Sequence, residues 1–96
     1  MQHIEPVLIP CETVRPGMFS DERLVTVRDH NSGEILPMFA DCYVLVERGD
    51  RYYIRVTRMG DDKAPGVSVC LLPVAATETA TMTPWVRIAN SEIVKP

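Results

Sequence analysis

Few residues in this chain have the type and spacing that acid–base or nucleophilic chemistry requires. His30 follows Asp29, a pairing that general acid–base catalysis can use, but it stands in the turn-forming run 29–33 with no nucleophile beside it. Asp21 and Glu22 are adjacent, so on a strand their side chains would point to opposite faces and form no paired carboxylate site. We therefore expect no catalytic residue and interpret the chain as non-enzymatic.

Metal and redox chemistry have no sequence signature either. The three cysteines, Cys11, Cys42 and Cys70, are far apart and form no C-x-x-C pair. Asp61 and Asp62 lack the regularly spaced oxygen ligands of a calcium loop. Cys42 and Cys70 lie in strand-like runs, where a free thiol behaves as a small buried hydrophobe. No metal and no cofactor is expected.

Composition and charge indicate one small domain with one basic segment. The chain has 96 residues, of which 46% are apolar and 24% charged, an ordinary globular balance. The net charge is −3, yet residues 42–59 carry four arginines and two acids, a local +2. The N-terminus lacks the basic and apolar regions of a signal peptide, so we expect a cytoplasmic chain with no membrane contact. The expected domain spans 1–96, with 1–6 as a loose arm.

The strongest structural signal is a β-hairpin over 42–59. Two runs rich in β-branched and aromatic residues flank Gly49 and Asp50, which is the pattern of a tight hairpin turn. A loop of two residues would pair Leu45 with Ile54, and a loop of three residues would pair Val46 with Ile54. The sequence leaves this register open. Both registers direct Ile54 toward the core and place three side chains on the opposite face: Arg51, Tyr53 and Arg55.

The outward face of the hairpin is the candidate binding surface. Besides the three residues just named, we include Arg48 and Arg58. Such a face is open to three interpretations. It can be a solvated sheet face whose arginine stems cover apolar neighbours. It can contact a protein partner or a second copy of the chain, because arginine and tyrosine are enriched in such contacts. It can also stack nucleic-acid bases, although the acidic remainder of the chain opposes that use.

The rest of the chain predicts further short strands separated by turns. We expect an edge strand or extended arm at 7–9, and strands at 22–28, 34–39, 66–72 and 85–89. We expect Pro37 to interrupt the strand at 34–39. Single helical turns are expected near 74–80 and 90–93. The predicted fold class is all-β, with about five to seven short antiparallel strands. A closed barrel would also hide the sheet edges from water.

This layout resembles the SH3-like small β-barrels, in which a single turn precedes the last strand, as over 85–94 here. The resemblance implies a small barrel, a fold that hosts many unrelated functions.

A second, shorter resemblance connects 68–78 with the plasmid-type (type II) dihydrofolate reductases, which are SH3-like barrels assembled as tetramers around a pore. The shared residues are Ser68, Val69, Pro73, Val74, Ala75, Ala76 and Glu78. That family contacts its ligands through a Val-Gln-Ile-Tyr segment, and the matching positions here are Val69, Cys70, Leu71 and Leu72. The resemblance implies a related fold and oligomerisation, but the missing glutamine and tyrosine argue against reductase activity.

The sequence therefore predicts a non-enzymatic binding module that contacts a protein partner or itself. A nucleic-acid-binding barrel using the face over 48–58 is the first alternative. A small oligomeric enzyme of the reductase kind is the second.

Overall fold

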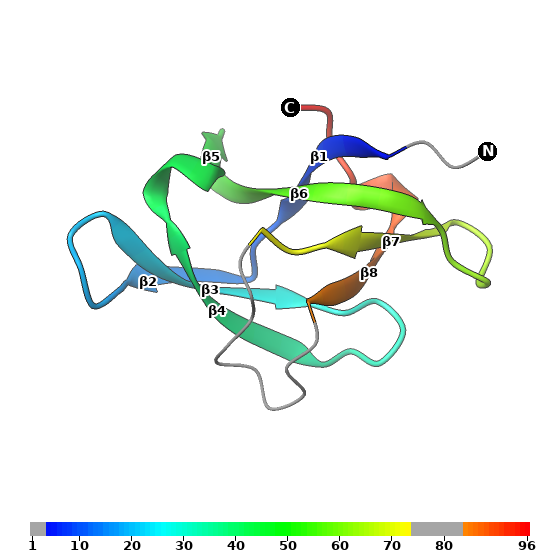
Figure 1. The fold of residues 1–96 in the computed structure, drawn as a ribbon, viewed down its shortest axis with the longest axis horizontal. Helices are drawn as coiled ribbons and strands as arrows, with labels where there is room; N and C mark the ends of the chain where they lie inside the picture. The colour runs from blue at the N-terminus through cyan, green and yellow to red at the C-terminus, as the bar shows by residue number, and fades with distance from the viewer. Residues whose placement is uncertain (1–3, 74–83) are drawn as a thin grey trace.

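Eight short strands in two antiparallel sheets make up the described part of the chain, residues 4–73 and 84–96, in this computed structural model (Figure 1). The five-stranded sheet has the order β1-β6-β7-β8, with β5 also paired to β6. Its strands are β1 (Glu5–Pro10), β5 (Leu45–Arg48), β6 (Arg51–Asp61), β7 (Val67–Leu71) and β8 (Trp85–Ala89). The three-stranded sheet has the order β2-β3-β4, and its strands are β2 (Thr13–Pro16), β3 (Glu22–Arg28) and β4 (Ile35–Asp41).

These elements confirm the all-β prediction, with differences in detail. The predicted turn near 90–93 is present as the 3₁₀ turn η2 (Asn90–Glu92), whereas the turn predicted near 74–80 lies outside the described residues. A second 3₁₀ turn, η1 (Cys42–Val44), replaces the start of the predicted hairpin strand. The short strand β2 was not predicted. Glu5 and Pro6, the last two residues of the expected loose arm, pair with β6.

Alternation along the strands explains the core between the two sheets. Val25 and Val27 of β3 point to the same side as each other and are fully buried, as is Ile54 of β6. Burying such apolar surface is the main driving force for folding. The core cluster draws on both sheets and contains Val7, Ile9, Cys11, Val25, Val27, Leu36, Met38, Ala40, Ile54, Val56, Cys70, Leu72, Val86 and Ile88.

The two sheets are not closed into a barrel, so that expectation is wrong. Border strands carry prolines instead: Pro6 and Pro10 in β1, Pro16 at the end of β2, and Pro37 within β4. Proline has no N–H to offer to an added strand, which protects an open edge from further pairing. Because β4 is a border strand, Pro37 is tolerated inside it and does not interrupt it.

The hairpin of β5 and β6 takes the two-residue register. Leu45 pairs with Ile54 and Arg48 pairs with Arg51, so only Gly49 and Asp50 form the turn. Gly49 has a φ of 64°, a left-handed conformation that glycine adopts without steric cost. The left-handed glycine explains why the hairpin signal in the sequence was reliable.

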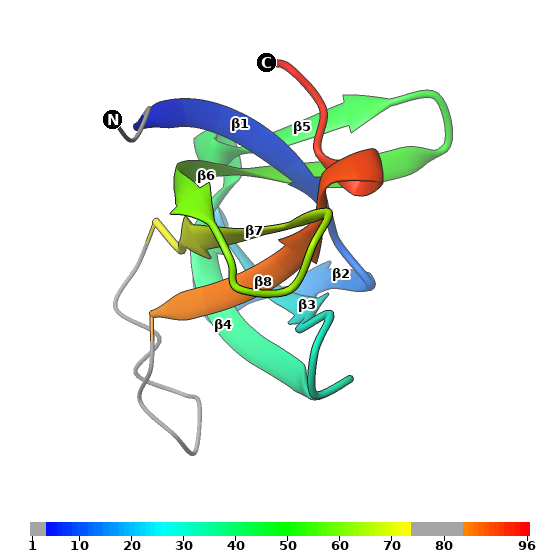
Figure 2. The ribbon, with the colours of Figure 1, turned by 90° about the vertical axis from the view of Figure 1, so that its right-hand side faces the viewer.

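β8 lies next to the three-stranded sheet (Figure 2). The side chain of Asp29 joins the two sheets there. Its carboxylate accepts a hydrogen bond of 2.8 Å from the backbone N–H of Arg87 in β8. The next residue, His30, donates its backbone N–H to the Arg87 carbonyl oxygen at 2.7 Å. Asp29 also accepts from the Ser32 backbone N–H and hydroxyl at 2.9 and 3.0 Å. Asp29 and His30 thus provide hydrogen-bond partners for the Arg87 backbone N–H and C=O groups at the outer edge of β8. Asp29 is only 6% exposed.

The pKa of the Asp29 carboxyl reflects two opposing effects. Burial raises it, but hydrogen bonds from the Ser32 and Arg87 backbone N–H groups and from the Ser32 hydroxyl outweigh burial and lower the pKa below its ordinary value. Because the folded-state pKa lies below the unfolded-state pKa, ionised Asp29 stabilises the fold at neutral pH. This contribution is lost as the pH falls through the folded-state pKa.

We expect Asp29→Asn to lower the free energy of unfolding at pH 7 by about 1–3 kcal/mol, because the amide cannot accept from all three donors. Urea unfolding measures this loss. The matched control Asp50→Asn, in the exposed hairpin turn, should change it by less than about 0.5 kcal/mol. The difference between wild type and Asp29→Asn should narrow below about pH 4. Equal stabilities of the two proteins at pH 7 would contradict this role.

Candidate interaction surface

The alternation of β6 separates two sets of side chains on its two faces. Ile54 and Val56 are buried against the core, whereas Arg51 and Arg55 are exposed and Tyr53 is half-buried on the opposite face. We call Arg51, Tyr53 and Arg55 the arginine face. The structure therefore places Arg51, Tyr53 and Arg55 on one face, as the sequence predicted, and Arg48, the register partner of Arg51, lies on the same side of the sheet.

Neither cation of the arginine face is neutralised within the described residues. The side chains of Arg51 and Arg55 form no ion pair and no hydrogen bond there, whereas Arg28, Arg58 and Arg87 each pair with a carboxylate. An unpaired guanidinium retains its full set of donors for a planar anionic group such as a carboxylate.

The C-terminal segment borders the arginine face. Leu8 of β1 pairs in register with Arg55, and cross-strand partners share a face of the sheet. Leu8 is nevertheless fully buried, and its backbone exchanges hydrogen bonds of 2.8 and 2.9 Å with Val94. Next to this bridge, Arg48 donates to the Lys95 carbonyl oxygen at 2.9 Å. Arg48 is therefore occupied in holding the C-terminal segment.

Arg58 does not belong to the arginine face. It pairs in register with Cys70, a fully buried core residue, and it precedes an irregularity in the pairing of β6 with β7. Its Nε donates to Ser68 Oγ at 2.8 Å and its Nη2 to Asp61 at 2.6 Å. The fully buried Ser68 hydroxyl is bonded in turn to Asn90. Arg58 lies two positions after Val56, and alternate residues of a strand share a face, so the sequence already indicated that the Arg58 side chain points inward. The sequence interpretation did not use this signal.

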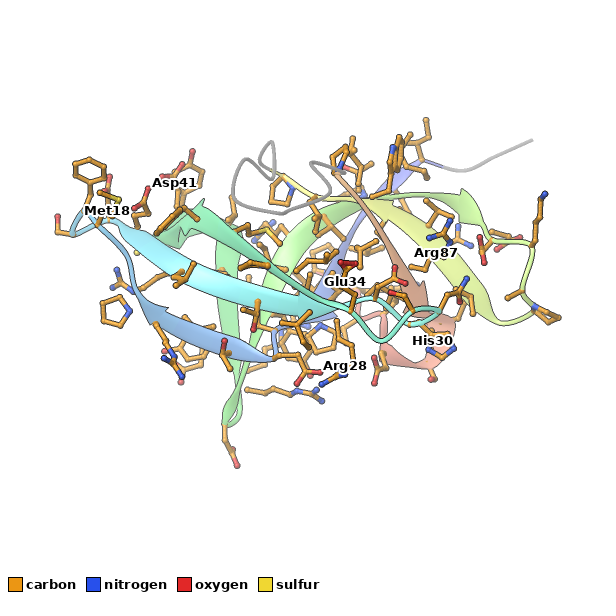
Figure 3. The ribbon with its side chains drawn as sticks, turned by 90° about the horizontal axis from the view of Figure 1, so that it is seen from below. Met18, Arg28, His30, Glu34, Asp41 and Arg87 are labelled. Carbon is orange, nitrogen blue, oxygen red and sulfur yellow. The ribbon has the colours of Figure 1, made fainter. Side chains whose placement is uncertain are left out.

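A separate hollow of about 650 Å³ lies between β8 and the β3–β4 turn. Two of its lining residues, Glu34 and Arg87, are labelled in Figure 3. Its lining comes from three distant segments, which is why the sequence did not reveal it: Asp29, Asn31, Ser32, Glu34, Leu36, Val69, Trp85 and Arg87. Two of its charged side chains already have structural partners. Asp29 accepts a hydrogen bond from the Arg87 backbone at the sheet junction, and the Arg87 side chain pairs with Asp62 at 3.3 Å.

The two buried thiols, those of Cys11 and Cys70, are unsuited to nucleophilic chemistry. Burial raises the pKa of Cys11 to about 12 and that of Cys70 to about 11, with smaller opposing effects of Arg51 and Arg58. Across residues 4–73 and 84–96, no three His, Cys, Asp or Glu side chains are grouped so as to hold a metal ion. The same residues include no helix with the length and hydropathy needed to cross a bilayer.

Comparison of the chain with protein-family models, curated proteins and solved structures finds no match. The function must therefore be argued from the geometry of this molecule.

The contrast between held and free arginines predicts different stability effects. Arg58→Met keeps an apolar stem but removes the bonds to Ser68 and Asp61, so we expect a loss of about 1–3 kcal/mol in the free energy of unfolding. The matched variant Arg51→Met should cost less than about 0.5 kcal/mol. Urea unfolding of both variants checks this order, and an equal or larger loss for Arg51→Met would contradict it.

Proposed function

We propose that this protein is a non-enzymatic protein-interaction module whose contact surface is the arginine face. The observation that carries the proposal is the pair of exposed guanidinium groups on either side of Tyr53, with no ion pair for either within the described part of the chain. A structural role would be expected to occupy these groups, as it occupies Arg48 and Arg58.

The chemistry of the arginine face favours an acidic segment of a partner protein. Two guanidinium groups can bind carboxylates in a bidentate manner. Tyr53 offers an apolar ring between them, and arginine with tyrosine dominates the energetics of many protein contacts. Among the described residues, Arg51 and Arg55 are the two cations of this face without a hydrogen bond or ion pair, which is less than the extended basic groove that nucleic-acid backbones require.

The finer features predicted from the sequence remain part of this proposal. Kinship with SH3-like folds is supported by the short antiparallel strands and by η2 after β8, in two sheets that stay open. A cytoplasmic location is supported by Cys11 and Cys70, which are free thiols buried as hydrophobes. Self-association is argued separately below.

An amide NMR titration with a short glutamate-rich peptide that contains interspersed leucines tests the proposal. We expect shifts centred on residues 51–55. Arg51→Glu/Arg55→Glu should weaken binding about tenfold or more, because both carboxylate contacts become repulsive. The control Lys63→Glu reverses an exposed charge in the β6–β7 turn and should bind as wild type.

Two results would overturn this function. One is the absence of peptide-induced shifts at 51–55 in the wild-type protein. The other is a stronger, salt-dependent response to a mixed-sequence single-stranded oligonucleotide, which would assign the arginine face to nucleic acid.

A further inference from the structure

One end of the molecule exposes several large apolar side chains. Met18 and Phe19 in the β2–β3 turn are 78% and 66% exposed. Tyr43 in η1 is 79% exposed, and Tyr52 of β6 is 41% exposed. We call these four residues the apolar tip. Grouped apolar side chains of this size on a small domain mark a contact surface.

The four side chains come from three segments that meet. The Cys42 backbone N–H donates to the Asp21 carbonyl oxygen at 2.8 Å, which fixes η1 against the β2–β3 turn. Met18, Phe19 and Tyr52 line one hollow of about 450 Å³. Figure 3 shows Met18 and Asp41, the residue before η1, at the same end of the molecule. Met18, Phe19 and Tyr52 therefore share one hollow, and Tyr43 lies at the same end of the molecule.

The exposed turn is held in place by hydrogen bonds. Gly17 donates its N–H to the Glu22 carbonyl oxygen at 3.0 Å, and Glu22 donates to the Phe19 carbonyl oxygen at 3.1 Å. The Met18 N–H donates to the Glu22 carboxylate at 3.0 Å. A Cβ at Gly17 would come within 2.9 Å of the Glu22 backbone, so the turn is tightly closed. A surface that is ordered in advance loses less entropy on binding.

Charges flank the apolar tip on both sides of the turn. Asp41 directly precedes η1, and Asp21 is joined to η1 by its carbonyl oxygen, so both acids lie on the side of Tyr43. Asp41 and, more weakly, Asp21 raise the pKa of the Tyr43 hydroxyl. Arg15 and Arg23 instead line the hollow that contains Tyr52. Arg23 is held by the Ser20 and Glu22 carbonyl oxygens, at 3.0 and 2.8 Å. The side chains of Arg15 and Asp21 form no hydrogen bond within the described chain.

We propose that the apolar tip binds the apolar tip of a second copy of this chain about a two-fold axis. A two-fold contact is self-complementary, because each patch meets the same patch on its partner. The acidic flank beside Tyr43 of one copy then lies against the basic flank beside Tyr52 of the other. Like charges on both flanks would oppose such a dimer, whereas opposite charges support it.

The size of the apolar tip sets the strength of this contact. Its four side chains expose roughly 500–600 Å² per copy, less than the ~800 Å² per partner of a standard interface. We therefore expect a weak, reversible dimer in the high-micromolar range.

Sedimentation velocity over low micromolar to millimolar concentration tests the inference with two charge reversals. Arg15→Glu places a carboxylate opposite Asp21 of the other copy, and Asp21→Arg places a guanidinium opposite Arg15, so each variant alone should dimerise at least about fivefold more weakly than wild type. An equimolar mixture of the two should restore association, because the new carboxylate at position 15 of one variant then meets the new guanidinium at position 21 of the other. Phe19→Ser should abolish association, and the remote control Lys63→Glu should leave it unchanged.

Three outcomes would overturn the inference: a wild-type sedimentation coefficient that does not rise with concentration, charge variants that associate as wild type does, or a mixture that associates no better than its components. The first outcome would leave the apolar tip to a different partner. Arg55→Glu, on the arginine face, should dimerise normally, so this inference and the proposed function can fail independently.

Discussion

The Asp29 carboxylate is the constraint on which the arrangement of the two sheets depends. It holds the β3–β4 turn through Ser32 and the outer edge of β8 through the Arg87 backbone. In a closed barrel a neighbouring strand would satisfy that edge, whereas here one buried side chain and the His30 backbone do so. Such a carboxylate has to remain ionised, because the three donors around it would otherwise lose acceptors in a buried place. The fold thus combines an apolar core with one polar junction.

The arginines of the hairpin differ in whether their side chains hydrogen-bond to other parts of the fold. Arg58 satisfies the buried Ser68 hydroxyl and Arg48 holds the C-terminal segment, so both are parts of the fold. The side chains of Arg51 and Arg55 form no hydrogen bond or ion pair within the described residues, although they lie on the same strand as Arg58. The same face also carries an aromatic ring. We expect a contact surface where charged side chains without a structural partner lie beside such a ring.

Local sequence patterns predicted most of the strands and the hairpin, but they could not predict contacts between residues that are far apart in the sequence. The Gly49–Asp50 turn and the alternation of β6 correctly placed Ile54, Arg51 and Arg55. The strand β2 was missed because Thr13–Pro16 carries an arginine and a terminal proline and lacks an apolar run. The sequence marked Asp29 only as a turn residue, because its partner Arg87 lies 58 positions away. The apolar tip was missed for the same reason, since the turn, η1 and β6 meet only in the folded chain.

The most direct test of the proposed function observes the guanidinium groups themselves. Two-dimensional NMR of the arginine Nε–Hε groups can follow each arginine while the glutamate-rich peptide is added. The proposed binding mode predicts slow hydrogen exchange for Arg58 Nε already in the free protein, and shifts on peptide binding at Arg51 and Arg55 with little change at Arg58. Unchanged Arg51 and Arg55 signals at saturating peptide would contradict it.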